Sequence, residues 1–336
     1  MARRRLSRQQ RERIRAIQAR RRAQLARRAD RAQEQNGEAI QEPGVVITRH
    51  GQNLVVEDEQ GDLHHCLSRQ NIGDPVCGDR VAWQRTGERE GVVTAILERD
   101  SVLIRPTYSG EVRPLAANIT QLVVVLAPLP PPSPYLLDQY LVAAEQIGVP
   151  VLIALNKKDL MDAAAIRGFE QDFGLYEDIG YPLIRISALH EHGLDPLVER
   201  LRDQTSILVG QSGTGKSSLV KALLPDRDIQ VGRLSEASGL GRHTTSATTL
   251  YRLPQGGALI DSPGVRSFRL GRLDRHRLER GFREFAPFLG HCRFSDCSHR
   301  DEPGCALRQA VAAGEIHPRR LANFLHMAQE MEQRRP

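Results

Sequence analysis

The sequence lacks any apolar run long enough to cross a bilayer, and its first residues lack the hydrophobic segment of a secretory signal. We therefore expect a soluble, cytoplasmic protein with no membrane partner. Cysteine is scarce as well: the 336 residues contain five, an odd number that does not suit a disulfide framework. Three of the five fall within residues 292–305 beside histidines, which is more typical of metal binding.

Acidic residues are fewer than basic residues. Lys and Arg total 47 against 41 Asp and Glu, which gives a net charge of +6. A positive balance indicates a polyanionic partner without identifying it. The length suffices for two or three compact units.

Residues able to build a core are few in the first 40 positions, where Arg, Ala and Gln dominate. This segment cannot fold alone. It has three interpretations: a solvated tail, an arm that becomes helical on RNA, or a transit peptide, although the acidic residues Glu12, Asp30 and Glu34 count against the last. We favour the RNA-contacting tail.

Short β-rich runs follow at residues 45–47, 54–56, 81–83 and 92–96, separated by turn-forming residues. Strands of this length and spacing predict a small five-stranded barrel of the oligonucleotide-binding type, which we place at residues 41–110. Such barrels bind RNA or serve as protein-contact modules. The pattern does not decide between the two.

Beyond Pro106 the pattern is α/β. Buried strands are predicted at residues 121–127 and 151–155, with a helical period between them that Gly148 ends. The sequence Asn156-Lys157-Lys158-Asp159 directly follows the carboxyl end of the second strand, which is where open α/β sheets bind ligands.

The chemistry of Asp159 favours guanine as the base bound by this motif. A carboxylate accepts two hydrogen bonds from guanine N1 and its 2-amino group, whereas adenine has neither donor there and would leave the charge unpaired. Asn156 can bond the base edge, and Lys157 can lie over the ring. The pair Ser187 and Ala188, after a strand at residues 183–186, matches the loop whose backbone amide meets guanine O6.

A phosphate-binding loop runs from Gly210 to Ser217, between a strand at residues 206–209 and a helix at residues 218–224. This is the context that a Walker A motif requires. Its glycines let backbone amides converge on the phosphates at the start of the helix. We expect Lys216 to bridge the β- and γ-phosphates as a catalytic group and the Ser217 hydroxyl to bind Mg²⁺.

Downstream, Asp261-Ser262-Pro263-Gly264 matches the Asp-x-x-Gly element of GTPases. We expect Mg²⁺ to be held by Ser217, Asp261 and a threonine of a mobile first switch at residues 239–245, Thr244 or Thr245, with Thr245 assigned to the metal. The residues expected to bind GTP are Asn156, Lys157, Lys158, Asp159, Ser187, Ala188, Gly210, Gln211, Ser212, Gly213, Thr214, Gly215, Lys216, Ser217, Ser218, Thr244, Thr245, Asp261 and Gly264.

The residue after this element is Val265, where Ras-like proteins place the glutamine that orients water. Valine cannot align a nucleophile, so another residue or a partner must do so. His243 is the catalytic candidate within the chain, because a neutral imidazole accepts a proton or aligns water. It serves this role or simply faces solvent. We expect slow intrinsic turnover that rises when a partner binds.

The sequence Cys292-x4-Cys297-x-His299-x5-Cys305 supplies four metal ligands in a segment with little core of its own. Three thiolates and one imidazole suit one structural, tetrahedral Zn²⁺ per chain. His291 is a rival ligand, but its place beside Cys292 makes joint ligation awkward. The helix that Pro318 opens carries a packing stripe, which completes a zinc-binding helical module.

The guanine motif precedes the phosphate loop, which reverses the ordinary GTPase order and indicates a circular permutation. With these motifs in this order, together with Gly241-Arg-His-Thr-Thr245 and the cysteine pattern, the chain resembles the RsgA family of small-ribosomal-subunit biogenesis GTPases over about residues 44–331. Ser262, where threonine is more usual, and the long Arg-rich start depart from that family.

The resemblance implies an oligonucleotide-binding barrel, a permuted GTPase domain and a zinc domain, which we place at residues 41–110, 111–272 and 273–336 after the tail at residues 1–40. It also implies hydrolysis of GTP to GDP and phosphate, stimulated by the small ribosomal subunit and its rRNA during late maturation of the decoding region. We expect the protein to be a monomer. The alternative is an RNA-binding protein with a regulatory, slowly hydrolysing GTP site and another partner. Permutation places the second switch directly before the zinc module, so GTP could favour the arrangement that grips the subunit and hydrolysis could release it.

Overall fold

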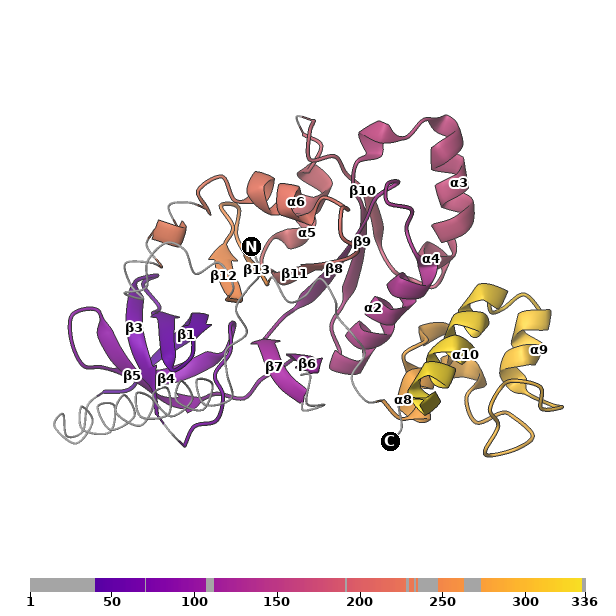
Figure 1. Cartoon of the computed structure of the whole chain (residues 1–336), viewed down its shortest axis with the longest axis horizontal. Coiled ribbons are helices and arrows are strands. Elements are labelled where there is room, and N and C mark those ends of the chain that lie inside the picture. The colour runs from indigo at the N-terminus through magenta and orange to yellow at the C-terminus, as the bar shows by residue number, and fades with distance from the viewer. Residues whose placement is uncertain are drawn as a thin grey trace, which may run out of the picture. The chain divides into compact units, whose positions relative to one another are not determined.

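The structure, a computed structural model, describes residues 40–69, 71–106, 112–190, 192–227, 230–232, 234, 247–262 and 273–333. The Arg-rich tail up to residue 39 and the whole predicted first switch at residues 239–245 lie outside these residues. The described part forms two compact units. The first is built on strands β1–β5, and the second contains most of the other elements (Figure 1). No helix in the described part is long and apolar enough to span a bilayer.

Strands β1 to β5 form the five-stranded barrel that the sequence predicts. Strand β1 pairs with both β2 and β4, β2 pairs with β3, and β3 and β4 both pair with β5, so the ring closes. Closure leaves no unpaired edge along the ring. The five strands are β1 (Glu42–His50), β2 (Asn53–Glu57), β3 (Leu63–Ser68), β4 (Arg80–Arg85) and β5 (Glu90–Ile96).

The barrel core surrounds Trp83, the one tryptophan of the sequence. Its indole lies over Gly91, where the first carbon of any side chain would come within 2.4 Å of the ring, so only glycine fits there. Cys66 and Cys77, the two cysteines outside residues 292–305, are buried in the barrel unit. The His64 ring packs against Trp83 in a tilted contact, with 4.6 Å between ring centroids, and is hydrogen-bonded to the carboxylate of Asp58 at 2.7 Å.

Asp58 is a buried carboxylate that several donors stabilise. Burial alone would raise its pKa, but hydrogen bonds from His64 and from the backbone N–H groups of Asp62 and Gln60 outweigh burial and hold the pKa below its usual value. A carboxyl with a lowered pKa in the folded state adds stability above its unfolded pKa and loses that stability as the pH falls through the folded pKa.

We therefore expect Asp58→Asn to destabilise the barrel by about 2 kcal/mol at about pH 6, with the deficit shrinking below about pH 4. Urea unfolding followed by Trp83 fluorescence isolates the barrel, because no other tryptophan contributes. Asp62→Asn, in the same turn but exposed, is the matched control and should show little change. A deficit that is independent of pH would contradict this role for the Asp58 charge.

The second unit contains a parallel sheet in the order β10-β9-β8-β11-β13, and β12 follows β13 in the order. Strands β8, β9 and β11 are almost wholly buried and mostly apolar, as strands covered on both faces should be. The bounds are β8 (Gln121–Leu126), β9 (Val151–Leu155), β10 (Leu183–Arg185), β11 (Thr205–Val209), β12 (Thr249–Arg252) and β13 (Ala258–Asp261). A separate two-stranded sheet pairs β6 (Val102–Pro106) with β7 (Val112–Ala117).

Helices connect these strands and follow the last of them. Helix α2 (Pro134–Ile147) begins at Ser133, whose side chain accepts from the Leu136 N–H, and ends at Gly148 with a φ of 69°, as the sequence predicts. The other helices up to the phosphate loop are η1 (Lys158–Leu160), α3 (Ala163–Phe173), α4 (Leu175–Asp178), α5 (Asp195–Leu201) and α6 (Lys216–Leu223).

The end of the described chain is a helical module in the same unit, with its own apolar core centred on Phe282, Phe285 and Phe324. Its elements are α8 (Arg275–Arg280), η3 (Arg283–Phe288), α9 (Ala306–Ala312) and α10 (Pro318–Gln333). Figure 1 shows this module beside α2, which contacts both α8 and α10. The predicted packing stripe of α10 is confirmed, because Leu321, Phe324 and Ala328 are buried.

A buried ionic cluster joins the module to α2. Arg320 of α10 is fully buried and donates to Asp138 of α2 and to Glu284. Asp138 also accepts from the Tyr176 hydroxyl and from the amide of Asn323, each at 2.6 Å. Every charge in this cluster therefore has an opposite charge or a hydrogen-bond donor as its partner.

Candidate nucleotide and metal sites

The predicted nucleotide motifs lie at one edge of the parallel sheet. The guanine motif follows β9, the phosphate loop follows β11, and Asp261 ends β13. Because β9, β8, β11 and β13 are neighbours in that order and all parallel, their carboxyl ends meet at the same edge. This edge is where open α/β sheets bind ligands.

The guanine motif is held in place by the phosphate loop. The Asn156 amide donates to the Thr214 carbonyl at 3.0 Å, and the Lys157 ammonium donates to the Gly213 carbonyl at 2.7 Å and to that of Leu129 at 3.1 Å. Lys157 has a φ of 62°, which turns the chain sharply after β9. Two motifs 58 positions apart thus form one continuous site.

Asp159 is exposed and its orientation is set by Ser187. The Ser187 hydroxyl donates to one carboxylate oxygen, and this bond lowers the pKa of Asp159 below its usual value. The backbone N–H of Lys158 donates to the Ile186 carbonyl, which ties the two loops together. The carboxylate is therefore ionised at neutral pH and fixed as a hydrogen-bond acceptor, as guanine recognition requires.

The Lys216 side chain is hydrogen-bonded to the backbone of the phosphate loop. Its ammonium donates to the carbonyls of Gly210 at 2.7 Å and Gln211 at 2.5 Å. Gly215 has a φ of 91°, and a side-chain carbon there would come within 2.4 Å of the Asn156 amide nitrogen. Glycine is therefore required both by the backbone and by the close approach of the guanine motif.

The phosphate loop also contacts α2. Burial raises the pKa of Tyr140, and a hydrogen bond with the Gly210 backbone partly offsets that increase. Tyr140 is almost fully buried beneath the loop's first residue. No nucleotide motif of the sequence indicates this contact of Tyr140 with the phosphate loop.

The remaining predicted nucleotide residues are partly described. Ser212, Gly213, Ser217 and Ser218 are exposed at the loop, and Asp261 is partly buried at the end of β13. Ser187 is buried after β10, and Ala188 is partly buried. The predictions for His243, Thr244, Thr245, Gly264 and Val265 lie outside the described residues.

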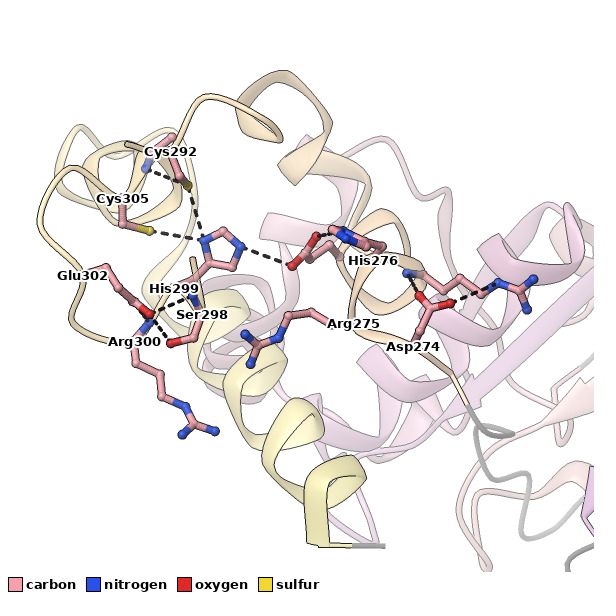
Figure 2. Close-up of polar contacts among 12 residues, drawn as sticks. Asp274, Arg275, His276, Cys292, Ser298, His299, Arg300, Glu302 and Cys305 are labelled. Carbon is pink, nitrogen blue, oxygen red and sulfur yellow. Dashed lines mark hydrogen bonds and ion pairs between the residues drawn. The ribbon is translucent and has the colours of Figure 1, made fainter. Parts of the chain in front are cut away.

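The four predicted metal ligands converge. One ligand atom from each of Cys292, Cys297, His299 and Cys305 lies within 4.8 Å of the other three. Nδ1 of His299 is 3.3 Å from the Cys305 sulfur and 3.6 Å from that of Cys292 (Figure 2). His291, the rival ligand, does not join this group.

These residues suit a tetrahedral metal ion. Zinc bound by thiolate at about 2.3 Å and by imidazole at about 2.0 Å would place its ligand atoms roughly 3.5 Å apart, close to the separations between His299 Nδ1 and the two sulfurs. Cys297, His299 and Cys305 are buried and Cys292 is partly buried, and together they offer four ligand atoms, as many as a tetrahedral ion binds. The cluster could therefore hold a metal ion.

Comparisons with known proteins agree with this geometry. A model of the RsgA GTPase family matches residues 96–271. A Pseudomonas aeruginosa protein described as small ribosomal subunit biogenesis GTPase RsgA is 45% identical over 334 residues, which cover 98% of each chain. A Hahella chejuensis protein with the same description is 44% identical over 340 residues, covering 99% of this chain and 98% of its own. The chain belongs to the RsgA GTPase family.

Solved structures extend the likeness to the fold. The crystal structure of YjeQ from Thermotoga maritima has a TM-score of 0.73 at 31% identity and covers 88% of this chain and 100% of its own. YloQ, described as a circularly permuted GTPase, has a TM-score of 0.71 at 28% identity, with 90% and 98% covered. The predicted fold is thus confirmed: a barrel, a circularly permuted GTPase domain and a helical module carrying the Cys3His cluster. As a member of the RsgA GTPase family, the chain is a hydrolase acting on GTP.

Proposed function

We propose that this GTPase binds the small ribosomal subunit and assists its late maturation, with hydrolysis stimulated by the subunit and driving release. The observation that carries the proposal is 45% identity over nearly the full chain to a protein named for small-subunit biogenesis. The net charge of +6 suits an rRNA partner.

The site residues have the following roles in this proposal. Asp159 and Asn156 select guanine, the phosphate-loop amides and Lys216 hold the β- and γ-phosphates, and Ser217 and Asp261 hold Mg²⁺. Mg²⁺ neutralises charge on the phosphates when it is bound. Lys216 can reach the phosphates by exchanging its bonds to the Gly210 and Gln211 carbonyls for bonds to phosphate oxygens.

In this proposal His243 activates the attacking water and Thr245 binds Mg²⁺. The small subunit completes this arrangement when it binds. Valine at position 265 supplies no polar group for that step. The lack of a glutamine at this position supports slow turnover by the free protein.

In the metal site, Cys292, Cys297, His299 and Cys305 would hold one Zn²⁺, which supplies structural cross-linking rather than catalysis. We propose domains at residues 41–110, 111–272 and 273–336, a cytoplasmic monomer, and RNA contact by the tail at residues 1–40. The barrel and the metal module serve as the RNA-contacting parts.

Cosedimentation with purified small and large ribosomal subunits tests the partner. With a non-hydrolysable GTP analogue the full chain should pellet with the small subunit only, and GDP should release it. Equal binding in both nucleotide states would reject release by hydrolysis. Binding to free RNA without preference for the small subunit would favour an RNA-binding protein with a regulatory GTP site.

A further inference from the structure

A carboxylate that no sequence motif indicates contacts one of the predicted metal ligands. Glu279 of α8 places one carboxylate oxygen 3.3 Å from Nε2 of His299, the ring nitrogen that does not contact the thiols. Both side chains are buried, with 8% of Glu279 and 6% of His299 exposed. Nδ1 is the nitrogen that faces the cysteines.

This arrangement fixes the chemical form of the imidazole. A histidine that binds a metal through Nδ1 must carry its proton on Nε2, and a buried N–H requires an acceptor. Glu279 is that acceptor. Its charge also increases the electron density that the ring donates to a metal.

The backbone of His299 has a conformation that is unusual for a residue with a side chain. Its φ is 62°, in the left-handed region that β-carbon-bearing residues seldom adopt. Such a conformation persists where surrounding contacts determine it. Here the contacts are the thiols at Nδ1 and Glu279 at Nε2, together with a T-shaped contact with the Phe324 ring at 5.8 Å between centroids.

The second oxygen of Glu279 bonds an exposed group, which offers an internal control. It lies 3.2 Å from Nδ1 of His276, a side chain that is 83% exposed. Loss of His276 removes a surface contact and leaves the bond from Glu279 to His299 in place.

We propose that Glu279 is a positioning residue for the metal site, which holds His299 with Nδ1 toward the metal and joins the site to α8. The inference rests on the proposed metal site. Helix α8 is the first described helix of the module, so this bond ties the metal site to the start of the module. Sequence alone offered no signal for it, because a single glutamate in a six-residue helix belongs to no motif.

Zinc retention by the purified full chain tests the proposal. Zinc release to a colorimetric chelator gives the apparent zinc affinity of wild type, Glu279→Ala, Glu279→Gln and His276→Ala. We expect Glu279→Ala to weaken zinc binding by about 10- to 100-fold, Glu279→Gln to weaken it less because the amide oxygen still accepts, and His276→Ala to stay within about twofold. GTP affinity, measured alongside, verifies that each variant is folded.

A second readout distinguishes positioning from general destabilisation. In the zinc-loaded wild type, nitrogen-15 spectra of the histidines should show His299 metallated at Nδ1 and protonated at Nε2, with that proton slow to exchange. Glu279→Gln, which preserves volume, should keep the tautomer but speed the exchange. Zinc affinity of Glu279→Ala within twofold of wild type, or ligation through Nε2, would overturn the inference. A wild-type chain that binds no zinc would instead reject the metal site itself.

Discussion

Asp159→Asn is expected to lower the affinity for GTP by about 10³-fold or more and to create affinity for xanthosine triphosphate. The carboxylate accepts from guanine N1 and its 2-amino group, whereas an asparagine amide would set a donor against that amino group. Xanthine carries an oxygen in place of the amino group, so the asparagine amide donates to it. Ser187, which orients Asp159 in the wild type, can bond the amide oxygen as well.

Equilibrium titration with fluorescent GTP and xanthosine triphosphate analogues measures this exchange of specificity. Asp178→Asn, an exposed aspartate of α4 in the same unit, is the matched control and should leave both affinities unchanged. Loss of GTP binding without any gain for xanthosine triphosphate would mean that Asp159 supports the loop rather than reads the base.

Arg320→Ala is expected to destabilise the second unit by about 3–5 kcal/mol, because it leaves Asp138 buried beside no cation. The substitution also removes the stacking of the guanidinium on Phe282, 4.5 Å from the ring centroid. Asp138 is itself fully buried, so water cannot replace the lost partner without opening the contact between α2 and α10.

Urea unfolding followed by circular dichroism measures the loss of stability of the second unit. Trp83 fluorescence reports separately on the barrel, which should unfold as in the wild type. Arg308→Ala removes an arginine that is 48% exposed and paired at the surface, and it should cost at most about 1 kcal/mol. The double variant Asp138→Leu with Arg320→Met should recover much of the stability, because apolar side chains replace both charges. An additive double variant would show that the two residues do not act as a pair.

Motifs predicted the nucleotide and metal sites because their chemistry restricts residue type and spacing at once. The phosphate loop needs glycine where φ is positive and the guanine motif approaches, and the metal needs four ligands within one short segment. The parallel strands were found for a related reason. Strands buried on both faces are continuous apolar runs, which few other structures produce.

Elements whose buried residues are polar could not be found in this way. Strand β3 was missed because its inward positions are His64 and Cys66, and a histidine is buried here with Asp58 as its hydrogen-bond partner. Arg320 lies four residues before Phe324 on the packing stripe of α10, yet an arginine on a helix ordinarily faces water. Its burial depends on Asp138 and Glu284, which are distant in sequence.

The central claim is that this chain is a GTPase whose turnover depends on the small ribosomal subunit, and phosphate release tests it most directly. Release from GTP and from ATP is followed with the chain alone and with purified small subunits, alongside Lys216→Ala. We predict slow release from GTP that the small subunit raises by more than about tenfold, none from ATP, and none from the Lys216→Ala variant. GTP turnover that small subunits leave unchanged, despite tight GTP binding, would contradict the account.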